Sequence, residues 1–237
     1  MQRFSTVVFL LAITGFANAQ DRTSDDPMIA EVEKAIVTQT NDFRNEHDLQ
    51  PVSMDSKLTE TASRFAKFMA KSGKYGHRAD GQTPAQRAKA AGYKYCVVRE
   101  NIAYRTNTGE VAAKSLIDVF VQGWIDSPPH RENMLADYVT ETGVAVATND
   151  GVTFYAVQLF GRPKSAAIKL KVTNESDDTR VIVIAANDSE DEVELPPRSV
   201  ITMKRCYPTT IELAGSQSAM KLQTSAELTI TNEGLTR

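Results

Sequence analysis

The period of the hydrophobic pattern changes once along this 237-residue chain, and the change restricts the fold more than any other feature. From about residue 27 to residue 124, apolar residues recur at helical spacing. Beyond about residue 143 they alternate with polar residues, as in strands. Gly161-Arg162-Pro163 separates a mixed segment, residues 28–163, from a β-rich segment, residues 164–237. The pattern therefore predicts an α+β protein with two domains.

The mixed segment has start and stop signals for four helices, followed by signals for a hairpin. Helices are expected over 27–47, 56–71, 83–92 and 109–124. Thr83 and Gln86 form a capping-box pattern at the start of the third helix. Asn149-Asp150-Gly151 is a strong hairpin signal between two runs rich in strand-forming residues, 143–148 and 152–160. This order of elements predicts a sheet held between helices.

The β-rich segment consists of short apolar runs separated by Asn, Asp, Pro and Gly. The runs cover 168–172, 181–184, 193–195, 200–203, 211–213 and 228–230. Short strands at this spacing are typical of a small antiparallel β-sandwich. The segment contains no histidine, so a histidine-based site must lie in the first domain.

Residues 1–19 have the form of a signal peptide. Arg3 precedes a short apolar run over 7–13, and Ala17-Asn18-Ala19 has the small-x-small form that signal peptidase cuts. The run is too short to cross a bilayer, which needs about 20 residues. Residues 20–27 are polar and acidic and are expected to form a disordered leader. No other segment is apolar enough to span a membrane, so we expect a secreted or periplasmic protein.

The composition argues against a nucleic-acid partner and limits the residues available for a metal site or a nucleophile. Twenty-seven Lys and Arg against 30 Asp and Glu give a formal net charge of -3. No nucleic-acid partner is expected, because binding phosphates needs clustered basic side chains. The chain has three His and two Cys, which leaves few residues for a metal site or a nucleophile.

Several short motifs fall in one order along the mixed segment. They are His77, Gly92-Tyr93, Glu100-Asn101-Ile102-Ala103, the stretch 124–134 (Trp-x-x-Ser-Pro-x-His-Arg-x-Asn-Met) and the stretch 157–161 (Val-Gln-Leu-Phe-Gly). Together they resemble the CAP superfamily of cysteine-rich secretory proteins, antigen 5 and plant pathogenesis-related proteins, and especially its bacterial secreted members. The resemblance covers about residues 29–163 and implies an α-β-α sandwich.

The resemblance also implies a central cleft lined by two histidines and two acidic residues. Three of these positions carry over to this chain as His77, Glu100 and His130. They are the candidate catalytic or metal-binding residues.

The fourth position is open. The second acidic group of the family often follows the Trp of the fourth helix, where this chain has Asp126 and Ser127. Some bacterial members instead have an acid shortly before the Arg of the third helix, where Gln86 is expected to serve as a cap. Asp126, Ser127 and Asn133 are therefore the further candidates for lining a ligand cleft.

Two imidazoles and a carboxylate suit a divalent metal ion such as zinc. Three protein ligands and an open water position make up a catalytic zinc site. Here the ligands are far apart in sequence and lack a helical His-Glu-x-x-His pattern, which weakens the catalytic interpretation. Without metal, the same three side chains would hydrogen-bond to one another. The remaining histidine, His47, is expected to be a surface or capping residue at the end of the first helix.

The two cysteines fall one in each domain. In an oxidising compartment, Cys96 and Cys206 can form a disulfide. It would hold the β-rich domain beside the segment that contains Glu100. Two buried thiols, or a bridge between two molecules, are the alternatives.

Three functions are compatible with these residues. The first is a binding module whose cleft holds an extracellular peptide, glycan or lipid, with or without a divalent metal. The second is a metal-dependent hydrolase, such as a protease, in which His77 and His130 hold the metal and Glu100 is a ligand or general base. The third is a structural extracellular or envelope protein without turnover. The absence of a clear fourth acid favours binding over catalysis.

Overall fold

The computed structural model describes residues 26–237 except 108, 188 and 217. The predicted signal peptide, residues 1–19, lies outside the described residues, as does most of the predicted leader. The end of that leader belongs to a helix, α1 (Pro27–Asn45), because Asp26 caps it by accepting a hydrogen bond from the Met28 amide at 2.9 Å. In the part of the chain that the structure describes, no helix is long and apolar enough to cross a membrane.

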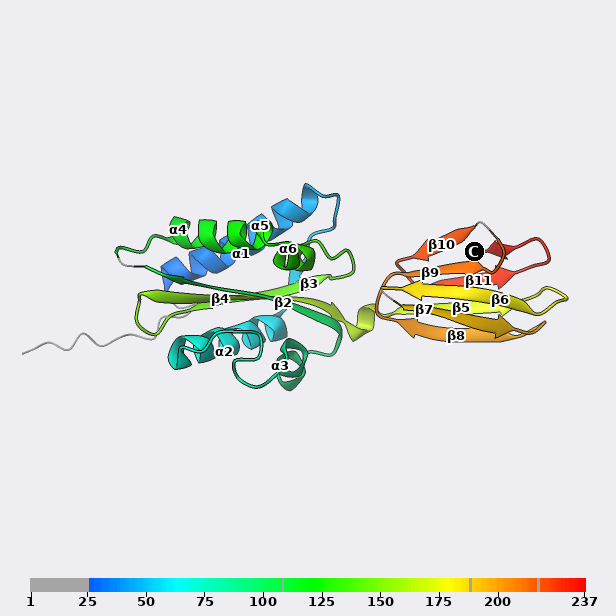
Figure 1. Cartoon of the computed structure of the whole chain (residues 1–237), viewed down its shortest axis with the longest axis horizontal. Coiled ribbons are helices and arrows are strands. Elements are labelled where there is room, and N and C mark those ends of the chain that lie inside the picture. Colours follow the sequence, from blue (N-terminus) through cyan, green and yellow to red (C-terminus); the bar gives the residue numbers. More distant parts are fainter. Residues whose placement is uncertain (1–25, 108, 188, 217) are drawn as a thin grey trace, which may run out of the picture.

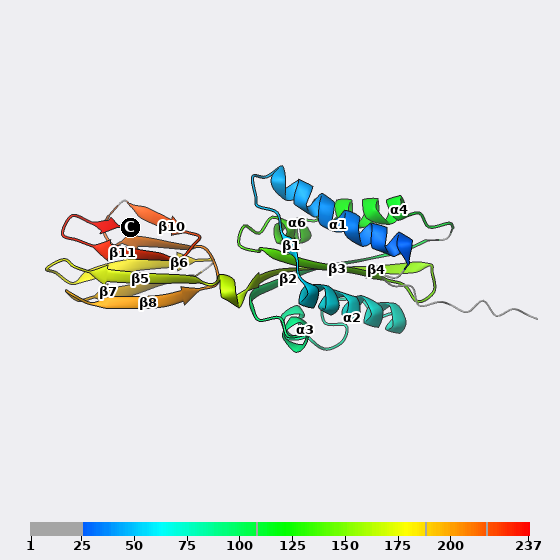
Figure 2. The same cartoon turned by 180° about the vertical axis from the view of Figure 1, so that it is seen from behind.

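The first domain is a sandwich of three layers (Figure 1). Its strands are β1 (Ser53–Met54), β2 (Tyr95–Thr106), β3 (Glu141–Ala147) and β4 (Thr153–Pro163), and its other helices are α2 (Ser56–Ser72), α3 (Pro84–Ala90), α4 (Ala113–Ile117), α5 (Gly123–Asp126) and α6 (Pro128–Met134). The strand order is β1-β3-β4-β2, with β1 parallel to β3 and the other pairs antiparallel. Helices α2 and α3 cover one face of the sheet, and the other helices cover the opposite face (Figure 2). The predicted α-β-α sandwich is confirmed.

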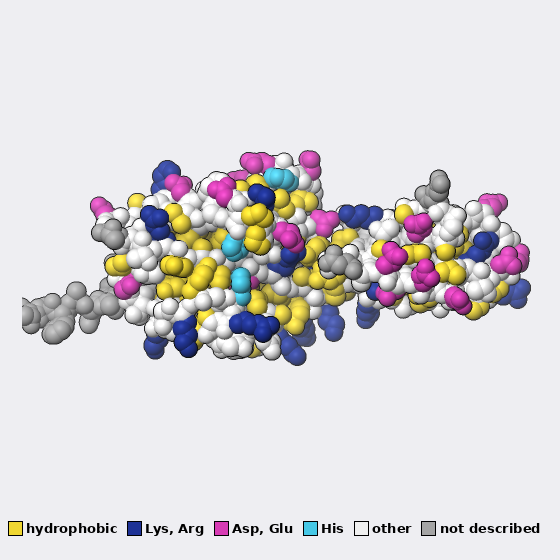
Figure 3. Space-filling view, viewed as in Figure 1, with side chains coloured by type: hydrophobic (Ala, Val, Ile, Leu, Met, Phe, Trp, Pro, Cys, Tyr) yellow, Lys and Arg dark blue, Asp and Glu magenta, His cyan; other side chains and the backbone are white. Residues whose placement is uncertain are grey.

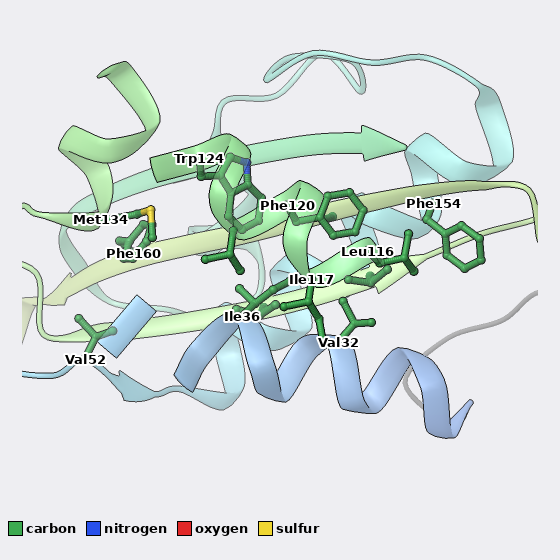
Figure 4. Packing of buried hydrophobic residues seen from close by; sticks show 14 of the residues in the cluster. Val32, Ile36, Val52, Leu116, Ile117, Phe120, Trp124, Met134, Phe154 and Phe160 are labelled. Atoms are coloured by element: carbon green, nitrogen blue, oxygen red, sulfur yellow. The ribbon is translucent and has the colours of Figure 1, made fainter. Parts of the chain in front are cut away.

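Each helical layer buries an apolar stripe against the sheet. On one face, Ile36 of α1 and the aromatic residues Phe120 and Trp124 are fully buried in one cluster (Figure 4). On the other face, α2 packs close to β3 at Gly143, where a Cβ atom would lie 2.2 Å from the backbone of Leu58. Glycine at this position therefore lets α2 lie directly on the sheet.

Several elements differ from the sequence-based expectation, and three of them bear on the site: the fourth helix, the unpredicted helix α6 that carries His130, and strand β2. The fourth helix begins at Ala113 rather than at residue 109, because Ala112 is extended, and it contains a π-helical turn over Asp118–Gln122. It ends where the two prolines predict, at the extended residue Ser127. Strand β2, in contrast, is not among the elements that the sequence predicts. It pairs with β4 along its length and carries Glu100 at its centre.

The second domain is a sandwich of two four-stranded sheets. Its strands are β5 (Ile168–Asn174), β6 (Arg180–Ala186), β7 (Ser189–Leu195), β8 (Val200–Arg205), β9 (Thr209–Leu213), β10 (Ala219–Leu222), β11 (Ala226–Ile230) and β12 (Leu235–Thr236). The sheet orders are β10-β9-β6-β7 and β12-β11-β5-β8. The predicted β-sandwich is confirmed, with one correction to its antiparallel pairing: β5 and β11 are parallel.

The two domains lie end to end and are joined by a short 3-10 turn, Lys164–Ala166 (Figure 1). A disulfide links Cys96 of β2 to Cys206, just after β8, with a Cα–Cα distance of 5.2 Å. The predicted Cys96–Cys206 pairing is thus confirmed. Beside it, the rings of Tyr138 and Tyr207 meet edge to face with centroids 4.9 Å apart. Covalent and packing contacts therefore both connect the domains.

Candidate functional site

The structure brings His77 and Glu100 into direct contact. His77 lies in the turn after α2 and its side chain is half exposed, whereas the Glu100 carboxylate on β2 is buried. His77 Nδ1 lies 2.9 Å from Glu100 Oε1. Because a carboxylate accepts hydrogen bonds, this contact makes Nδ1 the donor and leaves Nε2 on the outer side of the ring. The buried acid thus fixes the orientation of an exposed imidazole.

The second carboxylate oxygen of Glu100 is held by Arg87 of α3. Arg87 Nη2 donates to Glu100 Oε2 at 2.7 Å, and Nη1 donates to Asp80 Oδ1 at 2.8 Å. The guanidinium also lies over the ring of Phe65, 3.5 Å from its centroid, and donates to two backbone carbonyls. Both oxygens of Glu100 are therefore engaged, one by His77 and one by Arg87.

His130, on α6, lies near His77 on the surface of the first domain. Its Nδ1 lies 2.9 Å from Ser127 Oγ, and its ring is partly buried. Burial first, and then the charge of nearby His77, lower the pKa of His130 below its ordinary value of 6.5. Figure 3 shows two cyan histidine side chains next to each other on this face of the first domain. His130 is therefore biased toward its neutral form.

An amide network fixes α6 against β2. Asn133 Nδ2 donates to the Glu100 carbonyl at 3.1 Å and to Asn101 Oδ1 at 2.8 Å, while Asn101 Nδ2 donates to the His130 carbonyl at 3.1 Å. Arg99 in turn donates to Asn133 Oδ1. Asn133, predicted to line the cleft, thus holds the two site-bearing elements together through its amide.

The other candidates occupy separate positions. Asp126 is exposed on α5 and accepts a hydrogen bond from Gln122 at 2.9 Å. Gln86 completes the capping box of α3 with Thr83, as predicted. His47 is exposed beyond the end of α1 and donates to the Phe43 carbonyl at 2.8 Å, which fits its expected capping role. The second acidic group beside Glu100 is Asp80, which shares the Arg87 guanidinium.

Exposed tyrosines extend this face along β2. Tyr75 and Tyr104 are 46% and 53% exposed, and their ring centroids are 4.9 Å apart. The Tyr75 hydroxyl donates to the Ile102 carbonyl at 3.1 Å, which anchors the ring. Neither tyrosine is among the residues that the sequence predicts for the site. The sequence contains one signal for Tyr104: it lies four residues after Glu100, which places both side chains on the same face of a strand. Tyr75, His77, Tyr104 and His130 are called the histidine–tyrosine face below.

The residues present do not fit a three-ligand metal site. Among the described residues, no group of three His, Cys, Asp or Glu side chains is arranged to share a metal ion. Glu100 is the acid that such a site would need, and its two oxygens already bind His77 and Arg87. The arrangement instead offers two imidazoles and two aromatic rings for hydrogen bonding and stacking.

The comparisons with known proteins agree with the fold. The uncharacterized protein YkwD of Bacillus subtilis (strain 168) is 27% identical over 131 residues, which are 55% of this chain and 48% of that protein. The match thus spans about half the length of that relative.

Solved structures are also similar. An outer surface protein from Borrelia burgdorferi is 20% identical, with a TM-score of 0.52 over 62% of this chain and 99% of that one. An extracellular protein with an SCP domain from Bacillus anthracis str. Ames is 25% identical, with a TM-score of 0.47 over 56% of this chain and 41% of that one. The profile of the CAP family, described as the cysteine-rich secretory protein family, matches residues 37–160, just over half of the chain. The chain belongs to the CAP family.

Proposed function

We propose that this protein acts outside the cell or in the cell envelope as a binding module, and that its histidine–tyrosine face holds an extended peptide or glycan without cleaving it. The burial and the hydrogen bonds of the Glu100 carboxylate carry this proposal. The Glu100 carboxylate is 1% exposed and accepts hydrogen bonds from His77 and Arg87, so it contacts these two side chains rather than a ligand on the surface. Glu100 serves in this proposal as a buried anchor for the face.

The exposed part of the face has the chemistry of a recognition surface. Tyrosine rings offer apolar area with little loss of side-chain freedom, and they stack on peptide groups and sugar rings. The two imidazoles add hydrogen-bonding groups beside the rings of Tyr75 and Tyr104. Because the rings are half exposed rather than enclosed, they suit a chain that lies across the surface.

Two features support a location outside the cytoplasm. The sequence predicts a signal peptide, and the Cys96–Cys206 disulfide is of a kind that persists in oxidising compartments. Export is part of the proposal and is tested by the N-terminal sequence of the protein recovered from its native host.

The binding function is tested with an array of hexapeptides and of neutral and charged oligosaccharides. We expect ligands of the wild type to lose binding to a His77→Ala/Tyr104→Ala variant. The matched control is His47→Ala, which removes an exposed histidine elsewhere in the same domain and should bind as the wild type does. Ligands that bind both variants equally well would refute the proposal.

The same samples separate binding from hydrolysis. Each bound ligand is incubated with the protein, with and without added zinc, and is then analysed by mass spectrometry. We expect the ligand to stay intact under both conditions. Zinc-dependent products that disappear in Glu100→Gln would overturn the proposal in favour of a metal-dependent hydrolase.

A further inference from the structure

Two hollows at the junction of the domains share a wall. The first, of about 540 Å³, is lined by the start of α2, the turn before β2 and the junction turn. The second, of about 310 Å³, is lined by the Cys96–Cys206 disulfide and by residues of β5 and β8. Both are lined by Lys164 and Ser165, so the pair of hollows spans the junction from one domain to the other as one surface feature. We call it the junction groove.

Lysines line the junction groove from end to end. They are Lys57 and Lys94 in the first hollow, Lys164 in both, and Lys169 and Lys204 in the second. Lys57 pairs with Glu60 at 3.2 Å, whereas the other four form no ion pair with another described residue. Dark-blue basic side chains gather around the junction in Figure 3. The groove thus presents exposed, unpaired cations on a protein whose formal net charge is -3.

The acidic residues of the groove do not balance these charges. Asp55 accepts hydrogen bonds from the first amides of α2, and Glu141 accepts one from the Tyr93 hydroxyl at 2.5 Å. Both line the first hollow, and the described residues that line the second include no acid. The positive charge is therefore concentrated beside the disulfide.

One pair of lysines repels directly. Lys169 and Lys204 are directly opposite each other on the antiparallel strands β5 and β8, and both are exposed on the outer face of the sheet. Like charges in this position destabilise a sheet. An anion bound between them would relieve the repulsion, so the arrangement favours an occupied groove over an empty one.

We propose that the junction groove binds an acidic polysaccharide whose carboxylates lie along the lysines. The cations are lysines, which act as hydrated point charges and attract a densely charged chain rather than one planar group. The groove crosses two domains, which suits an extended occupant. Tyr95 and Pro163 add apolar surface against which a sugar ring can lie.

The test measures binding of polygalacturonate oligomers to the full chain with its disulfide intact, by calorimetry at low salt and at 0.5 M salt. We expect binding that weakens steeply with salt, because exposed charges are screened. Replacement of three groove lysines, Lys164→Glu/Lys169→Glu/Lys204→Glu, should weaken it by about tenfold or more. Neutral dextran of the same length should not bind.

A matched control makes the same change in charge elsewhere. Lys34→Glu/Lys67→Glu/Lys71→Glu replaces exposed lysines of α1 and α2 outside the groove, and its binding should stay within about threefold of the wild type. Equal weakening in the two triple variants would overturn the proposal, because it would reflect net charge alone. Binding of dextran as tightly as polygalacturonate would also overturn it.

A second variant, with a smaller change in charge, distinguishes weaker binding from loss of folding. Lys169→Gln/Lys204→Gln removes the repulsion, so it should melt no lower than the wild type and yet bind polygalacturonate more weakly. Unchanged binding in this variant would refute the assignment. Tighter binding of polyphosphate or single-stranded DNA at the same lysines would refute the polysaccharide as occupant. Self-association of the wild type that these substitutions abolish would show that a second copy fills the groove instead.

Discussion

Replacing Arg87 by leucine should destabilise the first domain more than any other single change at the site. The leucine keeps apolar contact with Phe65 but removes the cation that pairs with Asp80 and Glu100. The Glu100 side chain is 1% exposed and that of Asp80 is 15% exposed, so water cannot replace the lost partner well. Two carboxylates would then be left close together without the guanidinium between them.

The expected magnitude follows from this burial. Removing one partner of a buried ion pair lowers the free energy of unfolding by about 3–5 kcal/mol, because the remaining charge is left uncompensated. The carbonyls of His77 and Gln82 also lose their donors. This loss is a large part of the roughly 5–15 kcal/mol that stabilises a typical domain. We therefore expect Arg87→Leu to be marginally folded at room temperature.

Urea denaturation followed by tryptophan fluorescence measures this effect. Trp124 is the only tryptophan of the chain and is buried in the first domain, so its signal reports on that domain. The control is Arg64→Leu, because Arg64 is exposed and pairs with the partly exposed Glu60. Such surface pairs contribute about 1 kcal/mol or less, and the control should unfold nearly as the wild type does.

A double-mutant cycle with Glu100→Gln identifies the cause. If the unpaired charge of Glu100 causes the loss, the double variant should be more stable than the sum of the two single losses predicts, by at least about 1.5 kcal/mol. A loss below about 1 kcal/mol in Arg87→Leu, or strict additivity in the cycle, would refute the view that Arg87 and Glu100 form one unit.

Three further predictions concern other parts of the structure. Cys96→Ser/Cys206→Ser should lower the free energy of unfolding by about 3–5 kcal/mol, because the disulfide joins residues 110 apart in sequence. An unchanged melting temperature in calorimetry would contradict this. His77→Asn should raise the pKa of His130 in an NMR titration with chelator present, because a neighbouring charge is removed. Since the pKa of His130 is lowered in the folded protein, its contribution to stability is full above about pH 6.5 and is lost as the pH falls from there through the lowered pKa. Asn174→Ala should destabilise the second domain by about 2–3 kcal/mol, because the buried amide of Asn174 donates to three carbonyls. Hydrogen exchange in the second domain at the wild-type rate would disprove this.

The sequence predicted those parts of the structure that follow from local rules. The helix starting at Pro27 and the capping box of Thr83 and Gln86 depend on neighbouring residues, and both are present. Strand β2 could not be predicted in this way. Arg99 and Glu100 interrupt its apolar pattern, and their placement in a strand depends on partners far along the chain: Arg87 for Glu100, and Asn133 for Arg99.

In the candidate site, too, local motifs predict some residues, whereas others depend on how distant segments pack. The motifs indicated His77, Glu100 and His130, and the structure places His77 on Glu100 with His130 near His77. Their chemical roles stay predictions. Arg87 was not assigned to the site, because a basic residue in a short helix usually points to water and its burial depends on how α3 packs. The contact between Tyr75 and Tyr104 likewise depends on the turn that brings His77 back to β2.

The disulfide also changes the connectivity of the molecule. With Cys96 and Cys206 joined, the chain between them becomes a closed ring that includes the whole of β3 to β8 and the junction turn Lys164–Ala166. A single protease cut in that turn would open the ring without releasing either domain. Separation of the two domains would then require reduction as well as cleavage. The disulfide therefore keeps the two domains together after one cut in the turn that connects them.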